Sequence, residues 1–190
     1  MEGLETGLFN VSYIEKDFVP QDRFLIDEEF AAACDALVKT CADILVLSPD
    51  HKRVLLGKRD QYPMKGWWEI GGKMDPGETP KESCSRNIKR ELRLDIDPTR
   101  FHFIGTSNNA WVRRQQPPQE NGVHDFIVIH FLRLEPAEVS VIDHNLFFYQ
   151  YHEEYDHLEW FDIETLPEKK EMFHPALWQI LEKLRLYLNY

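Results

Sequence analysis

The chain has 190 residues and a formal net charge of −11, and 43% of its residues are hydrophobic. This length and apolar content predict one globular domain with a modest extension. The negative charge argues against a nucleic acid or an anionic membrane as partner, because phosphates select for Lys and Arg. No apolar run reaches about 18 residues, and the acidic N-terminus lacks the features of a secretory signal. Three cysteines without metal spacing favour free thiols, so we expect a cytoplasmic protein.

The first part of the chain predicts an arm, a short helix and a hairpin. Residues 1–24 show no hydrophobic period, whereas Asp27 is expected to cap a helix through about residue 38. Strands are predicted at 41–47 and 53–56, joined by a turn at 48–51. We therefore expect residues 1–37 to form an N-terminal arm with a short helix, and residues 38–190 to form the main domain.

The second part alternates strands with two helices. A short apolar segment at 67–70 ends at Gly71-Gly72, and Thr79 to Glu82 form a capping box that predicts a helix to about residue 94. Strands are predicted at 101–111, 123–134 and 158–161, and His174-Pro175 opens a final amphipathic helix. This order predicts an α/β protein, a mixed-sheet α/β/α sandwich with a helix on each side of the sheet.

One loop and the helix after it carry the most informative spacing. Gly72 is followed at fixed intervals by Glu78, Arg86 and Glu91, with the apolar Ile88 between the last two. Glycines allow such a loop to approach a ligand closely, and the helix then places its polar side chains on one face. This pattern resembles the signature of the Nudix hydrolase superfamily, and the resemblance implies a Nudix-type fold and a hydrolase.

The resemblance is incomplete, which makes this a degenerate Nudix box. Asn87 and Arg90 stand where the family has two further glutamates, and Arg93 replaces the glycine that usually ends the helix. Arg90 has three open interpretations: a phosphate contact, an ion pair or a solvent-exposed side chain. Because Arg93 disfavours the left-handed turn that glycine adopts, we expect the helix to run slightly longer than usual.

The number of glutamates left in the box determines how many metal ions it can bind. One helix glutamate is too few for a cluster of three ions, and a fixed positive charge at Arg90 works against metal binding. A single Mg²⁺ or Mn²⁺ ion is expected instead, bound by the Gly71 carbonyl, Glu91, Glu154 and the phosphates of the substrate. For Glu154, an exposed acidic loop residue is an equal alternative.

Several positions of the sequence match one branch of the superfamily, the GDP-mannose mannosyl hydrolases. This resemblance implies attack at the sugar carbon and release of a nucleoside diphosphate. The resemblance implies a substrate-binding set that consists of Arg59, Lys73, Arg86 and Asp43. Arg59 and Lys73 are also expected to stabilise the leaving diphosphate. The position of the branch's catalytic histidine falls on Tyr155, so His157, or His152 on the other side, becomes the candidate general base.

The leading interpretation is a hydrolase of a GDP-mannose-like nucleotide sugar, and two alternatives remain open. The first is an ordinary Nudix pyrophosphohydrolase. The second is a catalytically inactive module that binds a nucleotide or a partner protein. The expected ligand is a nucleotide sugar or another nucleoside diphosphate compound. The mannosyl hydrolase branch also implies a homodimer.

Overall fold

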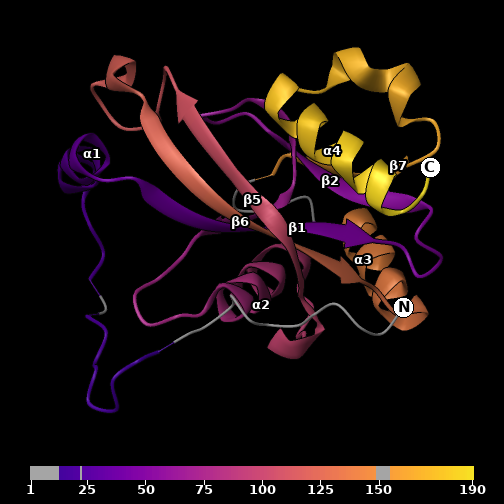
Figure 1. Ribbon diagram of the computed structural model, residues 1–190, viewed down its shortest axis with the longest axis horizontal. Helices are drawn as coiled ribbons and strands as arrows, with labels where there is room; N and C mark the ends of the chain where they lie inside the picture. Colours follow the sequence, from indigo (N-terminus) through magenta and orange to yellow (C-terminus); the bar gives the residue numbers. More distant parts are fainter. Residues whose placement is uncertain (1–12, 22, 149–154) are drawn as a thin grey trace.

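The computed structural model describes residues 13–21, 23–148 and 155–190 (Figure 1). The α-helices and strands follow in the order α1 Asp27–Ala36, β1 Lys39–Leu47, β2 Arg53–Arg59, β3 Gly66–Trp68, β4 Ile70–Lys73, α2 Pro80–Leu92, β5 His102–Trp111, β6 Val123–Arg133, α3 Pro136–Phe148, β7 His157–Asp162 and α4 Pro175–Tyr187. Short 3₁₀ helices lie at Pro98–Arg100, Gln119–Asn121 and Leu166–Met172. The alternation of strands and helices predicted from the sequence is confirmed.

The strands form one mixed, seven-stranded sheet around β1. The order is β3-β2-β1-β6-β5, while β4 pairs with β1 and β7 pairs with β2. Only β1 and β6 run parallel among these pairs, and their register places Lys39 opposite Asp125 and Asp43 opposite Ile129. Because β4 and β6 both pair with β1, the residues at the start of β1 lie between the glycine pair on one side and Asp125 on the other.

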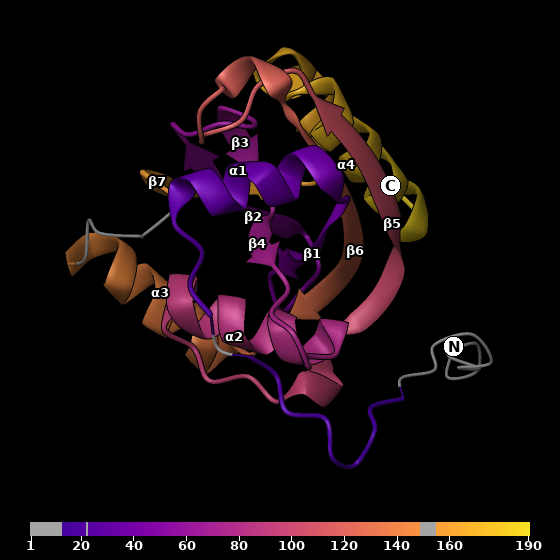
Figure 2. The ribbon, with the colours of Figure 1, turned by 90° about the vertical axis from the view of Figure 1, so that its left-hand side faces the viewer.

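Helices cover both faces of the sheet, which confirms the predicted α/β/α sandwich. Alternate residues of β1 contribute to two separate apolar clusters, as the two-residue period of a strand requires. Leu45 and Leu47 pack with α4, whereas Ile44 and Val46 pack with α2 and with Ile142 of α3. Figure 2 shows α1 apart from these layers, in front of the sheet and above α2.

The ends of the two predicted N-terminal helices differ from expectation. Asp27 is the first residue of α1 rather than its cap, and Ile26 precedes it without a side-chain hydrogen bond. The prediction that α2 runs longer is wrong, because Arg93 itself adopts the left-handed conformation (φ 59°, ψ 26°) and ends the helix after Leu92. The strain of a non-glycine residue there costs about 1 kcal/mol, and the fold tolerates it.

Two elements were not expected. The glycine pair was predicted to end a short strand, but Gly71 and Gly72 continue as β4 and pair with Asp43 and Ala42 of β1. The helix α3 was missed because residues 136–148 show no clear separation of polar and apolar faces.

Candidate functional site

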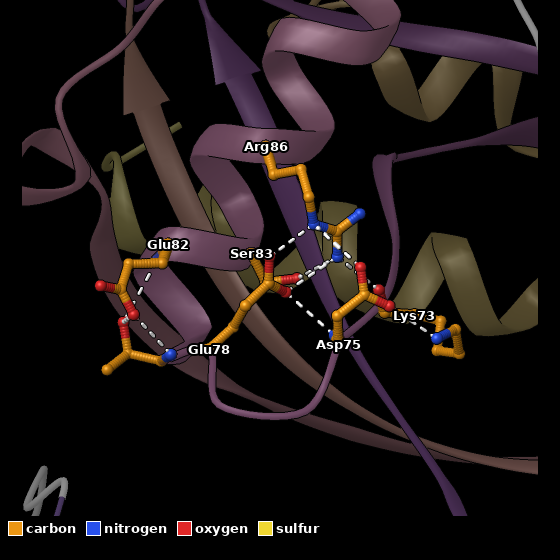
Figure 3. Close-up of polar contacts among 7 residues, drawn as sticks. Lys73, Asp75, Glu78, Glu82, Ser83 and Arg86 are labelled. Atoms are coloured by element: carbon orange, nitrogen blue, oxygen red, sulfur yellow. Dashed lines mark hydrogen bonds and ion pairs between the residues drawn. The ribbon is translucent and has the colours of Figure 1, made fainter. Parts of the chain in front are cut away.

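The glycine loop and α2 are joined by a network of polar contacts (Figure 3). Thr79 and Glu82 form the predicted capping box, since the Thr79 hydroxyl accepts from the Glu82 amide and the Glu82 carboxylate accepts from the Thr79 amide. Glu78 accepts a 2.9 Å hydrogen bond from the Asp75 amide. These contacts start the helix and close the loop before it. They give a physical reason for the fixed spacing between the glycine pair, Glu78 and the helix.

Arg86 completes this network through contacts with Glu78 and Lys73. Its Nε donates to Glu78 at 2.5 Å and its Nη2 donates to the Lys73 carbonyl at 2.9 Å. Burial opposes ionisation of Glu78, but the hydrogen bond from Arg86 and that from the Asp75 amide outweigh it and lower the pKa of Glu78. Arg86 therefore stabilises the loop, and its role as a substrate ligand stays a prediction.

The glycine pair lies closely packed on β1 and on a tyrosine from the distant β7 region. A Cβ atom at Gly71 would lie 2.2 Å from Oδ1 of Asp43, so only glycine fits. The Gly71 amide donates a 3.2 Å hydrogen bond to the hydroxyl of Tyr155, which in turn donates to the Glu69 carbonyl at 2.7 Å. Tyr155 thus fixes the backbone of the glycine loop.

A pocket of about 240 Å³ opens beside this loop. Four cationic side chains from four different segments line it: Lys39, Arg59, Lys73 and Arg90. Three aromatic side chains and two carboxylates also line it: Trp68, Trp111, Tyr155, Asp43 and Asp125. In a chain of net charge −11, such a concentration of cations favours an anionic ligand with several oxygens, such as a diphosphate.

Each carboxylate of the pocket is oriented by a tryptophan. Trp68 Nε1 donates to Asp43 and Trp111 Nε1 donates to Asp125, both at 3.1 Å. The two indole rings pack edge to face with their centroids 5.7 Å apart. Lys39 also pairs with Asp125 at 3.3 Å. The pocket wall is therefore a rigid aromatic pair that presents two hydrogen-bond acceptors.

A third carboxyl group is that of Glu69, the residue that follows Trp68 in the chain. It is fully buried, and neither of its oxygens has a hydrogen-bond partner among the described residues. Burial, reinforced by the negative charge of Asp43, raises the pKa of Glu69 well above its usual value. Burial and the neighbouring carboxylate thus both favour the protonated form of Glu69.

The structure brings together part of the predicted site. Arg59, Lys73, Asp43 and Gly71 line the pocket.

His157 is not among the residues that line this pocket. It lies on β7 with 60% of the side chain exposed, near Trp67 and Glu159. Glu154 and His152 lie outside the described residues. The roles predicted for His157 as base and for Glu154 as ligand thus gain no support from the geometry.

Sequence reasoning missed Lys39 and Asp125 as pocket residues. Neither belongs to the glycine-to-helix spacing, and only the parallel register of β1 and β6 places them opposite each other. A charged pair at the starts of two apolar strands was the available signal.

The sequence left three interpretations of Arg90 open, and its contacts in the structure decide between them. Arg90 lines the pocket and also binds Glu91.

Nudix hydrolases generally use divalent metals, so the fit of these residues to an ion needs a test. Arg90 Nε donates to Glu91 at 2.6 Å and Arg90 Nη2 donates to the Gly71 carbonyl at 3.2 Å. Both expected ligands thus already bind a cation. Across residues 13–21, 23–148 and 155–190, no group of three or more His, Cys, Asp or Glu side chains has a metal-binding arrangement. The described residues do not fit the expected single Mg²⁺ or Mn²⁺ ion, which needs about six oxygen ligands.

Among residues 13–21, 23–148 and 155–190, no helix has the length and the hydropathy that a membrane span requires.

Comparisons with known proteins agree with the geometry of the loop and helix. The chain is 27% identical over 155 residues to an oxidized purine nucleoside triphosphate hydrolase from Danio rerio, covering 77% of this chain and 81% of that protein. Its structure is similar to a MutT protein from Methanosarcina mazei Go1, with a TM-score of 0.59, 13% identity and coverage of 80% and 96% of the two chains.

A second structural neighbour extends over still more of the chain. The Nudix domain of NrtR from Shewanella oneidensis, solved with ADP ribose, has a TM-score of 0.54 and 16% identity, with coverage of 86% and 99%. The family model described as the NUDIX domain matches residues 39–184. Family and relatives together support a hydrolase. With its loop, capped helix and sheet all in place, the chain belongs to the Nudix domain family.

Proposed function

We propose that this protein hydrolyses a nucleoside diphosphate sugar of the GDP-mannose type and releases the nucleoside diphosphate and the free sugar. The observation that carries the proposal is the convergence of Lys39, Arg59, Lys73 and Arg90 on one pocket. A diphosphate carries charge over several oxygens, and separate cations distributed around it suit that shape. The paired tryptophans beside these cations suit an aromatic base.

The proposed reaction breaks the bond between the anomeric carbon and the bridging phosphate oxygen. Water attacks the carbon, the bond electrons move to the phosphate oxygen, and the nucleoside diphosphate leaves. Negative charge grows on that oxygen, where fixed guanidinium and ammonium groups stabilise it most. Arg59 and Lys73, already expected to serve the leaving group, both line the pocket and suit this role.

Attack at carbon suits this pocket better than attack at phosphorus. Hydrolysis at phosphorus commonly depends on metal-activated water, and the described residues hold no group of three or more His, Cys, Asp or Glu side chains arranged for a metal ion. The attacking water also needs a base. With His157 outside the pocket, Asp43 and Asp125 are the carboxylates that line it, and we assign the proton from water to one of them.

The ligand class has support from one structural neighbour. ADP ribose, bound in the Nudix domain of NrtR, is a nucleoside diphosphate joined to a sugar. Since that likeness concerns the fold alone, the choice of base and sugar for this chain rests on assay. GDP-mannose and GDP-glucose are the first substrates to test.

The identity of the reaction products and the position of an oxygen isotope label in them test the proposal directly. The protein is incubated with GDP-mannose in ¹⁸O-labelled water, once with Mg²⁺ and once with EDTA. We expect GDP and mannose as products, with the label in the sugar. GMP together with mannose 1-phosphate, or label in phosphate, would reject attack at carbon. No turnover with any nucleotide sugar would reject the function. In that case the pyrophosphohydrolase and the catalytically inactive binding module remain.

A second candidate function is favoured by the Danio rerio relative, whose name specifies an oxidized purine nucleoside triphosphate. In this alternative the chain cleaves a pyrophosphate bond and releases a nucleoside monophosphate. An 8-oxo-purine triphosphate assayed beside GDP-mannose separates the two candidates. Release of the monophosphate and pyrophosphate at a higher kcat/KM than any sugar release would select this second function.

We also propose a homodimer built around α1. The large apolar side chains that flank this helix, Phe24, Ile26 and Leu37, are exposed, and an interface would bury them. The predicted division into an arm at 1–37 and a main domain at 38–190 fits such a role. Light scattering at two concentrations tests it. Leu37→Ser should produce a monomer, and a monomeric wild-type protein would reject the dimer.

A further inference from the structure

A guanidinium lies between the two oxygen ligands that the family pattern assigns to a metal ion. Arg90 binds the Glu91 carboxylate through Nε at 2.6 Å and the Gly71 carbonyl through Nη2 at 3.2 Å. The Arg90 side chain is partly exposed and lines the diphosphate pocket, whereas the Glu91 side chain is 0% exposed. Arg90 therefore separates the buried carboxylate from the pocket.

The charge balance of the box explains why this arrangement is stable. A buried carboxylate needs a partner of opposite charge, because burial without one is costly. At positions 87, 90 and 91 the family pattern has three glutamates, whereas Asn87, Arg90 and Glu91 together carry no net charge. Glu91 is thus neutralised by its own neighbour, and the helix has no excess negative charge left to attract a divalent ion.

A divalent ion beside Arg90 would meet both repulsion and a shortage of ligands. Two positive charges a few ångströms apart repel each other strongly in a partly buried site. Magnesium and manganese prefer about six oxygen ligands, and the two that the family pattern assigns here, the Glu91 carboxylate and the Gly71 carbonyl, each already accept a hydrogen bond from Arg90. Arg90, with five N–H donors in a fixed plane, binds both oxygens and still faces the pocket.

We propose that Arg90 takes the place of the metal ion in this Nudix box, so that the protein binds the diphosphate without a divalent cation. The positive charge is then part of the chain and present at every metal concentration. The exclusion of metal stands independently of the proposed function, whereas the role toward the diphosphate rests on it.

Binding of Mn²⁺, measured by electron paramagnetic resonance, tests the exclusion without any assay of activity. We expect wild-type protein to bind no Mn²⁺ through Glu91. Arg90→Glu should gain at least about tenfold in Mn²⁺ affinity, and adding Glu91→Gln to that variant should abolish the gain. Lys89→Glu is the matched control, since it makes the same charge change on the exposed side of α2 and should show no gain.

Arg90→Gln provides a second test that does not depend on an added carboxylate. It removes the guanidinium, leaves Glu91 and Gly71 in place, and should also bind Mn²⁺ more tightly than wild type. Circular dichroism checks that each variant is folded. The proposal is overturned if wild type binds Mn²⁺ and Glu91→Gln removes that binding. It is equally overturned if neither Arg90 variant binds more tightly than Lys89→Glu.

Calorimetric titration with GDP tests the second half of the proposal. We expect the wild-type affinity in EDTA to stay within about threefold of that in Mg²⁺, and Arg90→Gln to lower it at least tenfold, roughly the value of one charge-assisted contact. Binding that needs Mg²⁺ would overturn the role of Arg90 toward the diphosphate. If GDP binds in neither buffer, the proposed function fails, while the Mn²⁺ measurements still decide whether metal is excluded.

Discussion

The hydroxyl of Tyr155 donates a 2.7 Å hydrogen bond to the backbone carbonyl of Glu69, although the two residues are 86 positions apart. The same hydroxyl accepts from the amide of Gly71, and the ring packs on Gly57, where an added Cβ would lie 2.1 Å from the ring. The segment before β7 therefore fixes the edge of the pocket from beneath. Tyr155 thus acts on the loop backbone and also lines the pocket.

Tyr155→Phe tests this relationship. The substitution keeps the ring but leaves one buried carbonyl and one buried amide without their partner, which costs about 1–3 kcal/mol. We expect the free energy of unfolding to fall by that amount in urea titrations, and the affinity for GDP to fall as the loop loosens. Tyr187→Phe, which changes an exposed tyrosine of α4, is the control. Equal stability of the two variants would show that the hydroxyl is unimportant.

A second prediction concerns Arg86, which binds the Glu78 carboxylate and the Lys73 carbonyl at once. Arg86→Gln should lower the free energy of unfolding by about 1–3 kcal/mol, because a partly buried carboxylate loses its charged partner. Arg86→Lys should rescue little, since a single ammonium cannot span both oxygens as a planar guanidinium does.

A double-mutant cycle with Glu78→Gln separates this pair from its surroundings. We expect a coupling energy of about 1 kcal/mol or more between Arg86 and Glu78, measured by chemical denaturation. Strictly additive effects would mean that the two side chains act independently. In that event Arg86 would return as a candidate substrate ligand.

The sequence predicted the parts of this protein that depend on local chemistry. The capping box at Thr79 and Glu82 determines where α2 begins through contacts within one turn, so short spacing was sufficient. The alternation of Leu45 and Leu47 with Ile44 and Val46 likewise reflects two packed faces. The glycine-to-helix spacing identified the family because loop closure and helix start are both local.

The predictions that failed concern residues whose contacts are distant in sequence. Lys39 and Asp125 meet only through the parallel register of two strands, which no local pattern specifies. Tyr155 was aligned with a catalytic position, yet its hydroxyl binds the backbone of the glycine loop. Arg93 ends α2 in a conformation that propensity argues against, which shows a tertiary constraint overriding a local preference.

A third prediction addresses the cationic pocket through Arg59 at the end of β2. Arg59→Gln should weaken GDP binding about tenfold in low salt, because one charge-assisted contact to a diphosphate is lost. The effect should shrink as ionic strength rises, since salt screens the remaining attraction. Arg53→Gln, on the same strand but beside Trp160, is the control and should leave the affinity unchanged. Equal losses in both variants would indicate an effect of net charge and not of the pocket.

The last prediction concerns pH and His130, which is buried on β6 between the sheet and α2. Its Nδ1 lies 3.5 Å from Sγ of Cys84, and its ring packs edge to face with Phe103. Burial, with a smaller contribution from the positive charges of Lys81 and His102, lowers the pKa of His130 to about 4. The folded protein therefore holds this histidine neutral, while the unfolded chain takes up a proton near pH 6.5.

Because the unfolded state binds more protons between these two pKa values, stability is fully present above about pH 6.5 and falls as the pH drops toward 4. The loss reaches on the order of 3 kcal/mol. Urea denaturation at intervals from pH 7 to pH 4 measures it. His130→Gln should flatten the curve in this window, whereas His157→Gln, on the exposed side of β7, should retain the wild-type slope. A slope unchanged in His130→Gln would assign the acid sensitivity to other groups.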